Sequence, residues 1–135
     1  MRGSSFQLSA FSMNTPSRSY RDLIVWQKAV DLVAEIYRTT NEFPDREKYA
    51  LASQMRRAAV SIPSNIAEGR SRSTAKDFRN FLHTSLGSAT ELETQLIIAQ
   101  RLRYVDENDF QTTSERLSEV CRMLHGMIKK LEAGS

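Results

Sequence analysis

The chain has 135 residues, of which 40% are hydrophobic and 26% are charged, and its formal net charge is +3. This length suits one domain around one core, and the composition is that of an ordinary globular protein. Three of the 19 basic residues lie in the first 21 positions, so the remaining 16 balance the 16 acidic residues. The chain after residue 21 therefore has no formal net charge and does not attract nucleic acid through its overall electrostatic field. Only a local basic patch could bind nucleic acid.

The sequence contains one cysteine, Cys121, which excludes an intramolecular disulfide and fits a reducing compartment. It lies beside Val120 and Leu124 at helical spacing, so we expect a small core side chain rather than a nucleophile. No run of 18 apolar residues is present, which excludes a transmembrane helix. We therefore expect a cytoplasmic protein that has no membrane partner.

Residues 1–19 are rich in serine and lack acidic side chains. Their apolar residues (Phe6, Leu8 and Phe11) are too few for the hydrophobic region of a signal peptide. We expect a disordered tail or residues left by an expression tag, although serine and arginine without acids are also typical of a transit peptide. The domain itself is expected to span residues 20–133.

The first helix is predicted from about residue 22 to residue 40. Pro44 disfavours a helical conformation at Phe43, and Asp45 is a favourable N-cap for the helix that follows. Apolar residues recur every three or four positions of the first helix and share one face, which predicts its buried side. These residues are Trp26, Ala29, Val33, Ile36 and Thr40.

The second helix is predicted over residues 46–68, with Gly69 in the left-handed conformation just after its end. Pro63 lies inside this helix and is expected to bend it, because proline lacks an N–H group and crowds the preceding turn. The core face consists of Leu51, Met55, Ala58, Ile62 and Ile66.

The third helix is predicted over residues 74–102, with Ser73 or Thr74 as its N-cap. Its buried stripe alternates spacings of four and three, which is typical of a heptad seam. Gly87 lies inside the helix and, together with the small residues near it, predicts the close approach of another helix. The stripe consists of Phe78, Leu82, Ser85, Ala89, Leu92, Leu96 and Ala99.

The fourth helix is predicted over residues 106–131, with Asp106 as its N-cap. The connections between the four helices are short, which favours antiparallel neighbours. The predicted fold is therefore an all-α, antiparallel up-down-up-down four-helix bundle. Its core is expected to bury Trp26, Leu51, Met55, Ile62, Leu82, Leu92, Leu96, Leu117, Val120 and Leu124.

Patterns of catalytic or metal-binding residues are missing from the sequence. There is no glycine-rich phosphate loop, no Cys/His cluster with metal spacing and no Glu-x-x-His pair of the kind that binds metals in bundles. His83 and His125 are isolated, which favours exposed or hydrogen-bonded side chains over catalytic bases. We expect no enzymatic activity, no cofactor and no metal.

The predicted second helix carries a further small and apolar surface behind its core face. A bundle helix needs one buried face, so a second one predicts a subunit interface, the alternative being a partly exposed alanine-rich helix. At about 100° per residue, the residues of this surface lie between about 80° and 180° from Leu51. They are Ala52, Arg56, Ala59, Val60, Pro63 and Ala67.

The remaining side of the second helix is a polar stripe of Arg57, Ser61, Ser64 and Glu68. One interpretation is a solvated face. The other is a hydrogen-bonded network in which Arg56 or Arg57 meets a glutamate of a neighbouring helix or subunit, the candidates being Glu68, Glu91 and Glu93.

A basic loop and helix start follow this stripe, with Arg70, Arg72, Lys76 and Arg79 close together in sequence. Serines, arginines and the free N–H groups of a helix N-terminus are suited to binding a phosphate, so these four residues are the candidate nucleic-acid site. A solvated basic loop is the alternative.

Three segments resemble the bacterial 23S ribosomal RNA intervening-sequence proteins: YRDLIVWQKAVDLVAEIYRTTNEFP, YALASQMRRAAVSIPSNIAEGRSR and FRNFLHTSLGSATELETQL. The resemblance covers roughly residues 20–131, and the block from Gln54 to Gly69 is its most specific part. It implies a four-helix bundle that assembles as a ring-like pentamer and has no established enzymatic activity. A relative of that family, the accessory protein of diversity-generating retroelements, binds a reverse transcriptase and nucleic acid.

Two classes of function follow from these observations. The first is a non-catalytic homo-oligomer, by resemblance a pentamer, that binds RNA or DNA through the basic loop. The second is a scaffold that recruits a protein partner without binding nucleic acid. Nucleic-acid binding that weakens as salt rises would favour the first.

Overall fold

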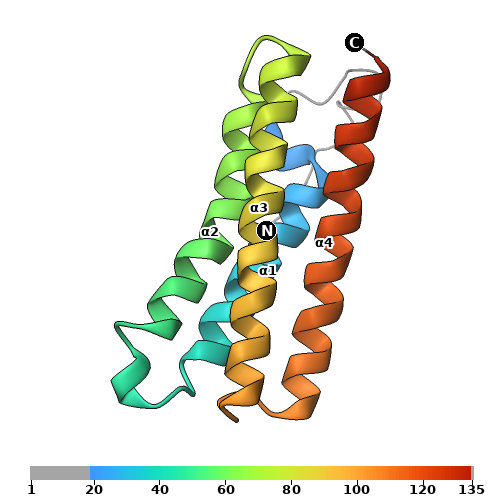
Figure 1. The fold of residues 1–135 in the computed structure, drawn as a ribbon. Helices are drawn as coiled ribbons and strands as arrows, with labels where there is room; N and C mark the ends of the chain where they lie inside the picture. Colours follow the sequence, from blue (N-terminus) through green and yellow to red (C-terminus); the bar gives the residue numbers. More distant parts are fainter. Residues whose placement is uncertain (1–18, 135) are drawn as a thin grey trace, which may run out of the picture.

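The computed structural model describes residues 19–134, and within these residues the chain forms helices and no strands. Figure 1 shows consecutive long helices running in opposite directions, which confirms the predicted all-α four-helix bundle. The elements in chain order are η2 (Tyr20–Asp22), α1 (Ile24–Thr40), η3 (Asp45–Glu47), α2 (Leu51–Arg70), α3 (Ala75–Arg101) and α4 (Glu107–Ala133). The tail predicted for residues 1–19 lies, except for Ser19, outside the described residues.

The starts of α3 and α4 follow the predicted capping chemistry. The Thr74 hydroxyl accepts a hydrogen bond from the Asp77 N–H at 3.1 Å. The Asp106 carboxylate accepts one from the Asp109 N–H at 2.7 Å. Each cap satisfies one of the N–H groups that a helix leaves unpaired at its start, so these two boundaries are confirmed to within a residue.

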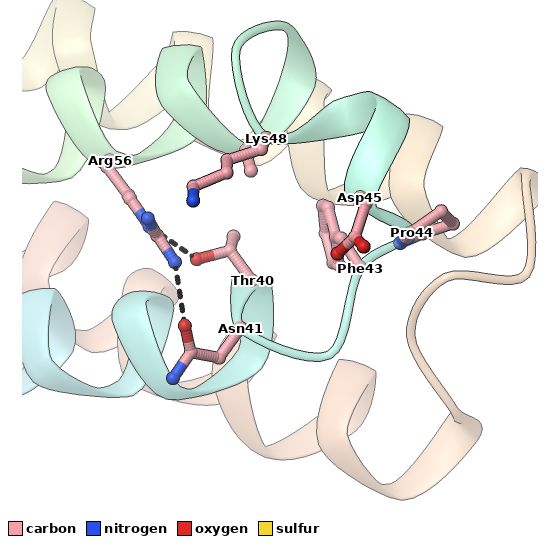
Figure 2. Close-up of a pocket in the computed structure, with 8 residues that line it drawn as sticks. Thr40, Asn41, Phe43, Pro44, Asp45, Lys48 and Arg56 are labelled. Carbon is pink, nitrogen blue, oxygen red and sulfur yellow. Dashed lines mark hydrogen bonds between the residues drawn. The ribbon is translucent and has the colours of Figure 1, made fainter.

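The connection between α1 and α2 differs from the prediction. Pro44 and Asp45 follow the buried Phe43 (Figure 2), and Asp45 starts the short turn η3 instead of capping a long helix. Residues 48–50 separate this turn from α2, and the last of them, Ala50, is non-helical, with φ of −123° and ψ of −106°. The second helix therefore begins at Leu51 rather than at residue 46, and Leu51 is partly buried instead of fully buried.

The end of α2 also differs, because Gly69 lies inside the helix and no glycine among the described residues has a positive φ. Gly69 is buried against α3. A Cβ atom on it would stand 2.7 Å from the Phe81 Cβ and 3.0 Å from the Phe78 Cδ1. The predicted left-handed cap is therefore wrong, and this glycine serves the close approach of two helices.

The left-handed position is found at the end of α3, where Arg103 has a φ of 66°. The Arg103 N–H donates to the Gln100 carbonyl and the Tyr104 N–H donates to the Ala99 carbonyl, both at 2.9 Å. This pair of bonds is a Schellman motif, in which glycine is the favoured left-handed residue.

Replacing Arg103 with glycine is therefore expected to stabilise the fold by about 0.5–1 kcal/mol, because it removes the clash of a Cβ atom in this conformation. Urea denaturation measures the change. Arg103→Ala, which also removes the charge but keeps the Cβ, is the control and should give no comparable gain.

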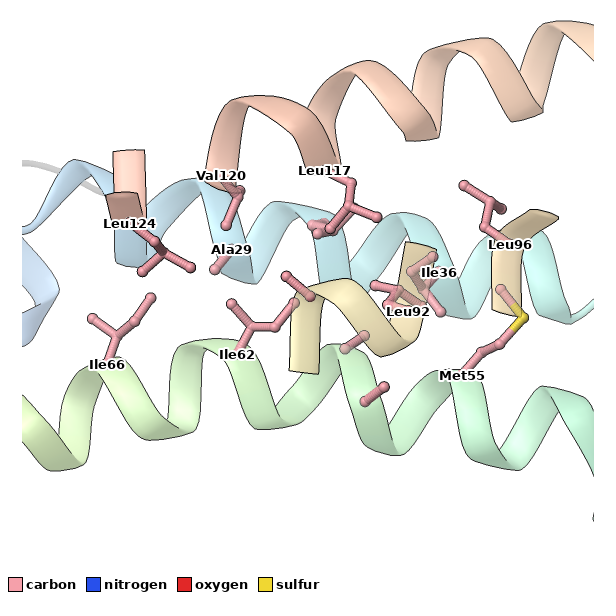
Figure 3. Packing of buried hydrophobic residues seen from close by; sticks show 14 of the residues in the cluster. Ala29, Ile36, Met55, Ile62, Ile66, Leu92, Leu96, Leu117, Val120 and Leu124 are labelled. Carbon is pink, nitrogen blue, oxygen red and sulfur yellow. The ribbon is translucent and has the colours of Figure 1, made fainter. Parts of the chain in front are cut away.

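The core lies between the four helices, and Figure 3 shows its aliphatic side chains converging from all of them. Eight of the ten residues expected to be buried are buried. The exceptions are Leu51 and Trp26, which is partly buried with its ring edge-on to Tyr20 at 5.2 Å. In α1 the buried stripe is turned towards Val25 and Leu32, which leaves Trp26 beside the core rather than within it.

The seam between α1 and α4 is charged. The Glu35 side chain is only 9% exposed and lies 3.1 Å from Arg116, while Thr113 donates its hydroxyl hydrogen to Glu35 at 3.0 Å. Arg38 pairs with Asp109 at 3.3 Å, and Lys28 pairs with Glu119 at 3.3 Å. These cross-helix bonds fix the register of α4 on α1.

Candidate functional site

The candidate residues centre on α2, which contacts both α1 and α3 in the bundle. Two of its sides are therefore covered within the chain, and only a strip along its outer surface remains open. That arrangement decides which of the predicted site residues are available to another molecule.

The predicted interface surface is largely buried by the chain itself. Ala52 and Ala59 are 2% and 0% exposed, and Pro63 is also buried, so these three residues do not reach a neighbouring subunit. A helix placed between two neighbours needs a wider apolar arc than a single stripe, which explains the second small apolar face. Of the six candidates, Val60 is exposed at 40%, and Arg56 and Ala67 are partly exposed.

Arg56 connects α2 to the end of α1. Its Nε donates to the Thr40 hydroxyl at 2.8 Å and its Nη2 donates to the Asn41 side-chain oxygen at 3.3 Å (Figure 2). The guanidinium also lies over the Tyr37 ring, 4.8 Å from its centre. These contacts hold the planar group in place, so Arg56 is a structural bridge as well as a surface cation.

An open hollow of about 570 Å³ lies beside the N-terminal half of α2; we call it the α1–α2 hollow. Tyr49 at its rim is 88% exposed, and Tyr37 is 44% exposed. Its lining contains three cations and no acidic side chain. The residues that line it are Tyr37, Lys48, Tyr49, Ser53, Arg56, Arg57, Val60 and Ser61.

The predicted polar network is only partly present. The Ser88 hydroxyl of α3 donates to the Ser61 hydroxyl at 2.8 Å, and the Asn65 amide donates to the Ser61 hydroxyl at 3.0 Å. Another α3 serine, Ser85, donates its hydroxyl hydrogen to the Ile62 carbonyl at 2.8 Å. Short side chains thus join α2 and α3 directly, and Ser61 is the one member of the predicted set that bonds to another helix within the described chain.

The predicted pairing of arginine with glutamate across helices is absent from residues 19–134. Arg57 donates to the Ser53 hydroxyl at 3.1 Å, and Glu68 pairs with Arg72 instead. Ser64 is exposed on the outer surface. Sequence reasoning missed Asn65, although its position four residues after Ser61 places both side chains on one helix face.

A second hollow of about 260 Å³ lies over the seam between α2 and α3; we call it the α2–α3 hollow. Gln54, Arg57, Ala58, Ser61, Ser88 and Glu91 line it. Arg57 and Ser61 border both hollows, so the outer surface of α2 forms a ridge between them.

The four candidate nucleic-acid residues differ in availability. Arg72 pairs with Glu68 at 2.7 Å and lies over the Phe81 ring, 4.9 Å from its centre. Arg70 and Arg79 are partly buried, and each makes an interaction within the chain. Lys76 is exposed near the start of α3. The fold thus brings the four to one end of the bundle, but it already engages three of them.

The bundle end that contains this loop is more basic than the opposite end. Residues 19–23, 68–79 and 129–134 contain seven basic side chains (Arg21, Arg70, Arg72, Lys76, Arg79, Lys129 and Lys130) and four acidic ones (Asp22, Glu68, Asp77 and Glu132). At the opposite end, residues 38–50 and 99–110 contain five basic and six acidic side chains. Figure 1 shows the α2–α3 connection and the end of α4 at the same end. Sequence reasoning missed Lys129 and Lys130, because only the fold brings them near the loop.

Among residues 19–134, no three histidine, cysteine or acidic side chains gather as a cation site. His83 and His125 are exposed. The helices of the described region are also too polar or too short to cross a lipid bilayer.

Cys121 is partly buried and packs against the core. Burial raises the pKa of its thiol, Glu93 raises it further and Arg122 opposes the rise. We expect Cys121 to react with a thiol reagent roughly tenfold or more slowly than in urea-unfolded protein, because less thiolate is present and access is restricted. Because the thiol pKa is higher in the folded protein than in the unfolded chain, the folded protein binds the thiol proton more tightly. The resulting stabilisation is complete below the ordinary thiol pKa and is lost as the pH rises through the folded-state pKa. Equal reaction rates in folded and unfolded protein would contradict the expectation.

Comparison with known proteins identifies the fold and the family. A Bacteroides thetaiotaomicron protein of unknown function from the S23 ribosomal protein family has a similar structure, with a TM-score of 0.73. The two sequences are 24% identical over 78% of this chain and 96% of that one, which shows a shared fold. No curated protein matches this chain. The family described as 23S rRNA-intervening sequence protein matches residues 21–126, and neither description names a catalytic activity. Because that match spans most of the chain, this protein belongs to the 23S rRNA-intervening sequence protein family.

Proposed function

We propose that this protein is a non-catalytic, cytoplasmic homo-oligomer, a pentamer, that binds RNA or DNA through the basic end of its bundle. The observation that supports this function is the excess of seven basic over four acidic side chains at that end. An excess of this size is small in one chain. Repeated around a ring of parallel copies, it would neutralise many phosphates at once, and the contributions of the copies would add.

Lys76 is the proposed leading contact, together with Arg70, Arg72 and Arg79. Lys76 is exposed, and a phosphate near the start of α3 would also meet the positive end of the helix dipole. Arg72 would exchange its ion pair with Glu68 for one with a phosphate, because the planar guanidinium can bind either a carboxylate or a phosphate group. These side chains meet phosphates rather than base edges, so we expect little sequence preference.

Fluorescence anisotropy with single-stranded and duplex RNA at two salt concentrations tests this proposal. The protein should lack residues 1–18, because Arg2 and Arg18 could bind by themselves, and it should keep Ser19, whose hydroxyl accepts the Arg21 N–H. We expect the Arg70/Arg72/Lys76→Ala variant to lose about tenfold or more in affinity at low salt, since three phosphate contacts per copy are removed. The same number of charges removed at the other end, in Arg46/Arg101/Arg103→Ala, should change affinity little. Equal binding by both variants, or no binding by the parent, would contradict the nucleic-acid function.

The second candidate function is a scaffold that recruits a protein partner. It is supported by the α1–α2 hollow, where Tyr49 is 88% exposed and Val60 is 40% exposed. Exposed aromatic and aliphatic side chains beside cations are common at protein interfaces. Absence of RNA and DNA binding together with a stable oligomer would favour this candidate.

Self-association is tested by light scattering at micromolar concentration. We expect a mass near five times the 15.4 kDa of one chain. Val60→Glu should dissociate the assembly, because it replaces an apolar contact with a carboxylate that an interface would have to bury and that would occupy the neighbouring cations. Val60 is 40% exposed in the single chain, so the substitution should leave the fold intact, which far-ultraviolet circular dichroism checks. A 15.4 kDa parent protein would refute self-association.

A further inference from the structure

The outer ridge of α2 separates two surfaces of opposite chemical character. On one side lies the α1–α2 hollow, with Lys48, Arg56 and Arg57 and no acidic side chain in its lining. None of these three cations forms an ion pair within residues 19–134, although Arg56 has uncharged partners in Thr40 and Asn41. This side therefore combines uncompensated positive charge with exposed tyrosine and valine.

The other side is bordered by α3, which contributes a carboxylate and two large aliphatic side chains. Glu91 lines the α2–α3 hollow and has one long bond, from the Gln95 amide at 3.4 Å. Ile98 and Leu102 follow it by seven and eleven positions, which places all three on one stripe of the helix. Ile98 is 43% exposed and Leu102 is 50% exposed, although residues of this kind are usually buried.

We propose that the α1–α2 hollow of one copy receives the Glu91, Ile98 and Leu102 stripe of a second copy of this chain. This inference rests on the proposed self-association and assigns its two surfaces. The hollow has room for aliphatic side chains beside Val60 and the tyrosines, and its cations face the carboxylate of Glu91. Burying the exposed aliphatic and aromatic groups supplies affinity, and the charge pairing selects the register.

The two surfaces are different, so the contact is heterologous and its repetition gives either a closed ring or an open filament. They lie on adjacent faces of the bundle that meet along α2. Adjacent faces of a square bundle meet at about 90°, and wedges of this angle close into a ring of about four copies, or of five where the faces meet at about 72°. In such a ring α2 is the helix nearest to the axis, and its exposed residues Ser64 and Glu68 face the central opening.

Two variants that each disable one surface test the assignment: Val60→Glu for the hollow and Ile98→Lys, which would set a cation against the cations of the hollow, for the stripe. Each should be monomeric alone by light scattering, with an unchanged circular dichroism spectrum. An equimolar mixture should form a 1:1 dimer and nothing larger, because each variant keeps the surface that the other lacks. Ile24→Glu is the matched control, since Ile24 is also exposed, at 59%, but belongs to neither surface. It should assemble like the parent protein.

The outcomes separate this inference from the proposed self-association. A monomeric parent protein would remove both. An assembled parent with an assembled Ile98→Lys variant would overturn the role of the stripe and leave self-association standing. Two monomeric variants whose mixture stays monomeric would show that the two surfaces do not bind each other, which also overturns the inference.

Discussion

Gly69→Ala is expected to destabilise the bundle by about 1–3 kcal/mol, which is the cost of forcing extra volume into a packed interior. The new Cβ would stand 2.7 Å from the Phe81 Cβ, 3.0 Å from the Phe78 Cδ1 and 3.2 Å from the Phe78 carbonyl oxygen. The Phe81 Cβ and the Phe78 carbonyl oxygen are fixed by the helix backbone and cannot rotate away. The helices α2 and α3 would therefore have to move apart, which would also stretch the bonds from Ser85 and Ser88 to α2.

Gly87→Ala is the matched control, because the substitution is identical and the glycine also lies inside a helix. A Cβ on Gly87 would meet nothing within 4 Å, so the close approach of another helix predicted at this glycine is wrong. The higher helix propensity of alanine should therefore stabilise the protein by about 1 kcal/mol. Chemical denaturation of both variants at one protein concentration measures the two changes. Changes of the same sign would show that the separation of α2 and α3 does not depend on Gly69.

Glu35→Ala is expected to cost about 2–3 kcal/mol of unfolding free energy, because it leaves a buried hydroxyl and a cross-helix arginine without their acceptor. The Thr113 side chain is fully buried and donates to Glu35 at 3.0 Å. Arg116 is about half exposed and can turn to water, which keeps the loss below that of a fully buried ion pair.

Glu119→Ala removes a carboxylate from the same seam and is the control. Its partner Lys28 and its own side chain are both about 40% exposed, so the loss should be below about 1 kcal/mol. The double variant Glu35→Ala/Thr113→Val should recover part of the loss, because the unsatisfied hydroxyl is removed. Equal losses for Glu35→Ala and Glu119→Ala would mean that burial at this seam contributes little.

The fold could be predicted because apolar spacing and capping chemistry act locally. Thr74 and Asp106 cap the helices that the pattern assigned to them, and the heptad stripe of α3 from Leu82 to Ala99 is buried. The errors arose where tertiary packing overrides local preference. Gly69 follows an apolar run in the way that a C-terminal glycine does, yet the helix continues because α3 lies against it. Arg103 takes the left-handed position although arginine has no preference for it.

The candidate site was less predictable, because a helical wheel does not show how many neighbours a helix has. Ala59 and Pro63 were assigned to a subunit interface on their angular positions, but they are buried because α2 packs against two other helices. Val60 lies next to them in sequence and remains exposed. The partners of Ser61 on α3 and the grouping of Lys129 with Lys76 depend on contacts between segments far apart in the chain. Periodicity within one segment carries no information on such contacts.

The charged seam between α1 and α4 has a consequence for how the bundle opens. Two of its ion pairs, Lys28–Glu119 and Arg38–Asp109, join partly exposed side chains and are screened by dissolved salt. The seam between α2 and α3 depends instead on close packing and short hydroxyl bonds, which salt affects little. Transient opening should therefore begin by separation of α1 from α4. In hydrogen–deuterium exchange, raising the ionic strength should speed the labelling of amides in α1 and α4 while those in α2 and α3 stay protected. The molecule would then behave as a stable helical pair with two outer helices whose attachment depends on ionic strength.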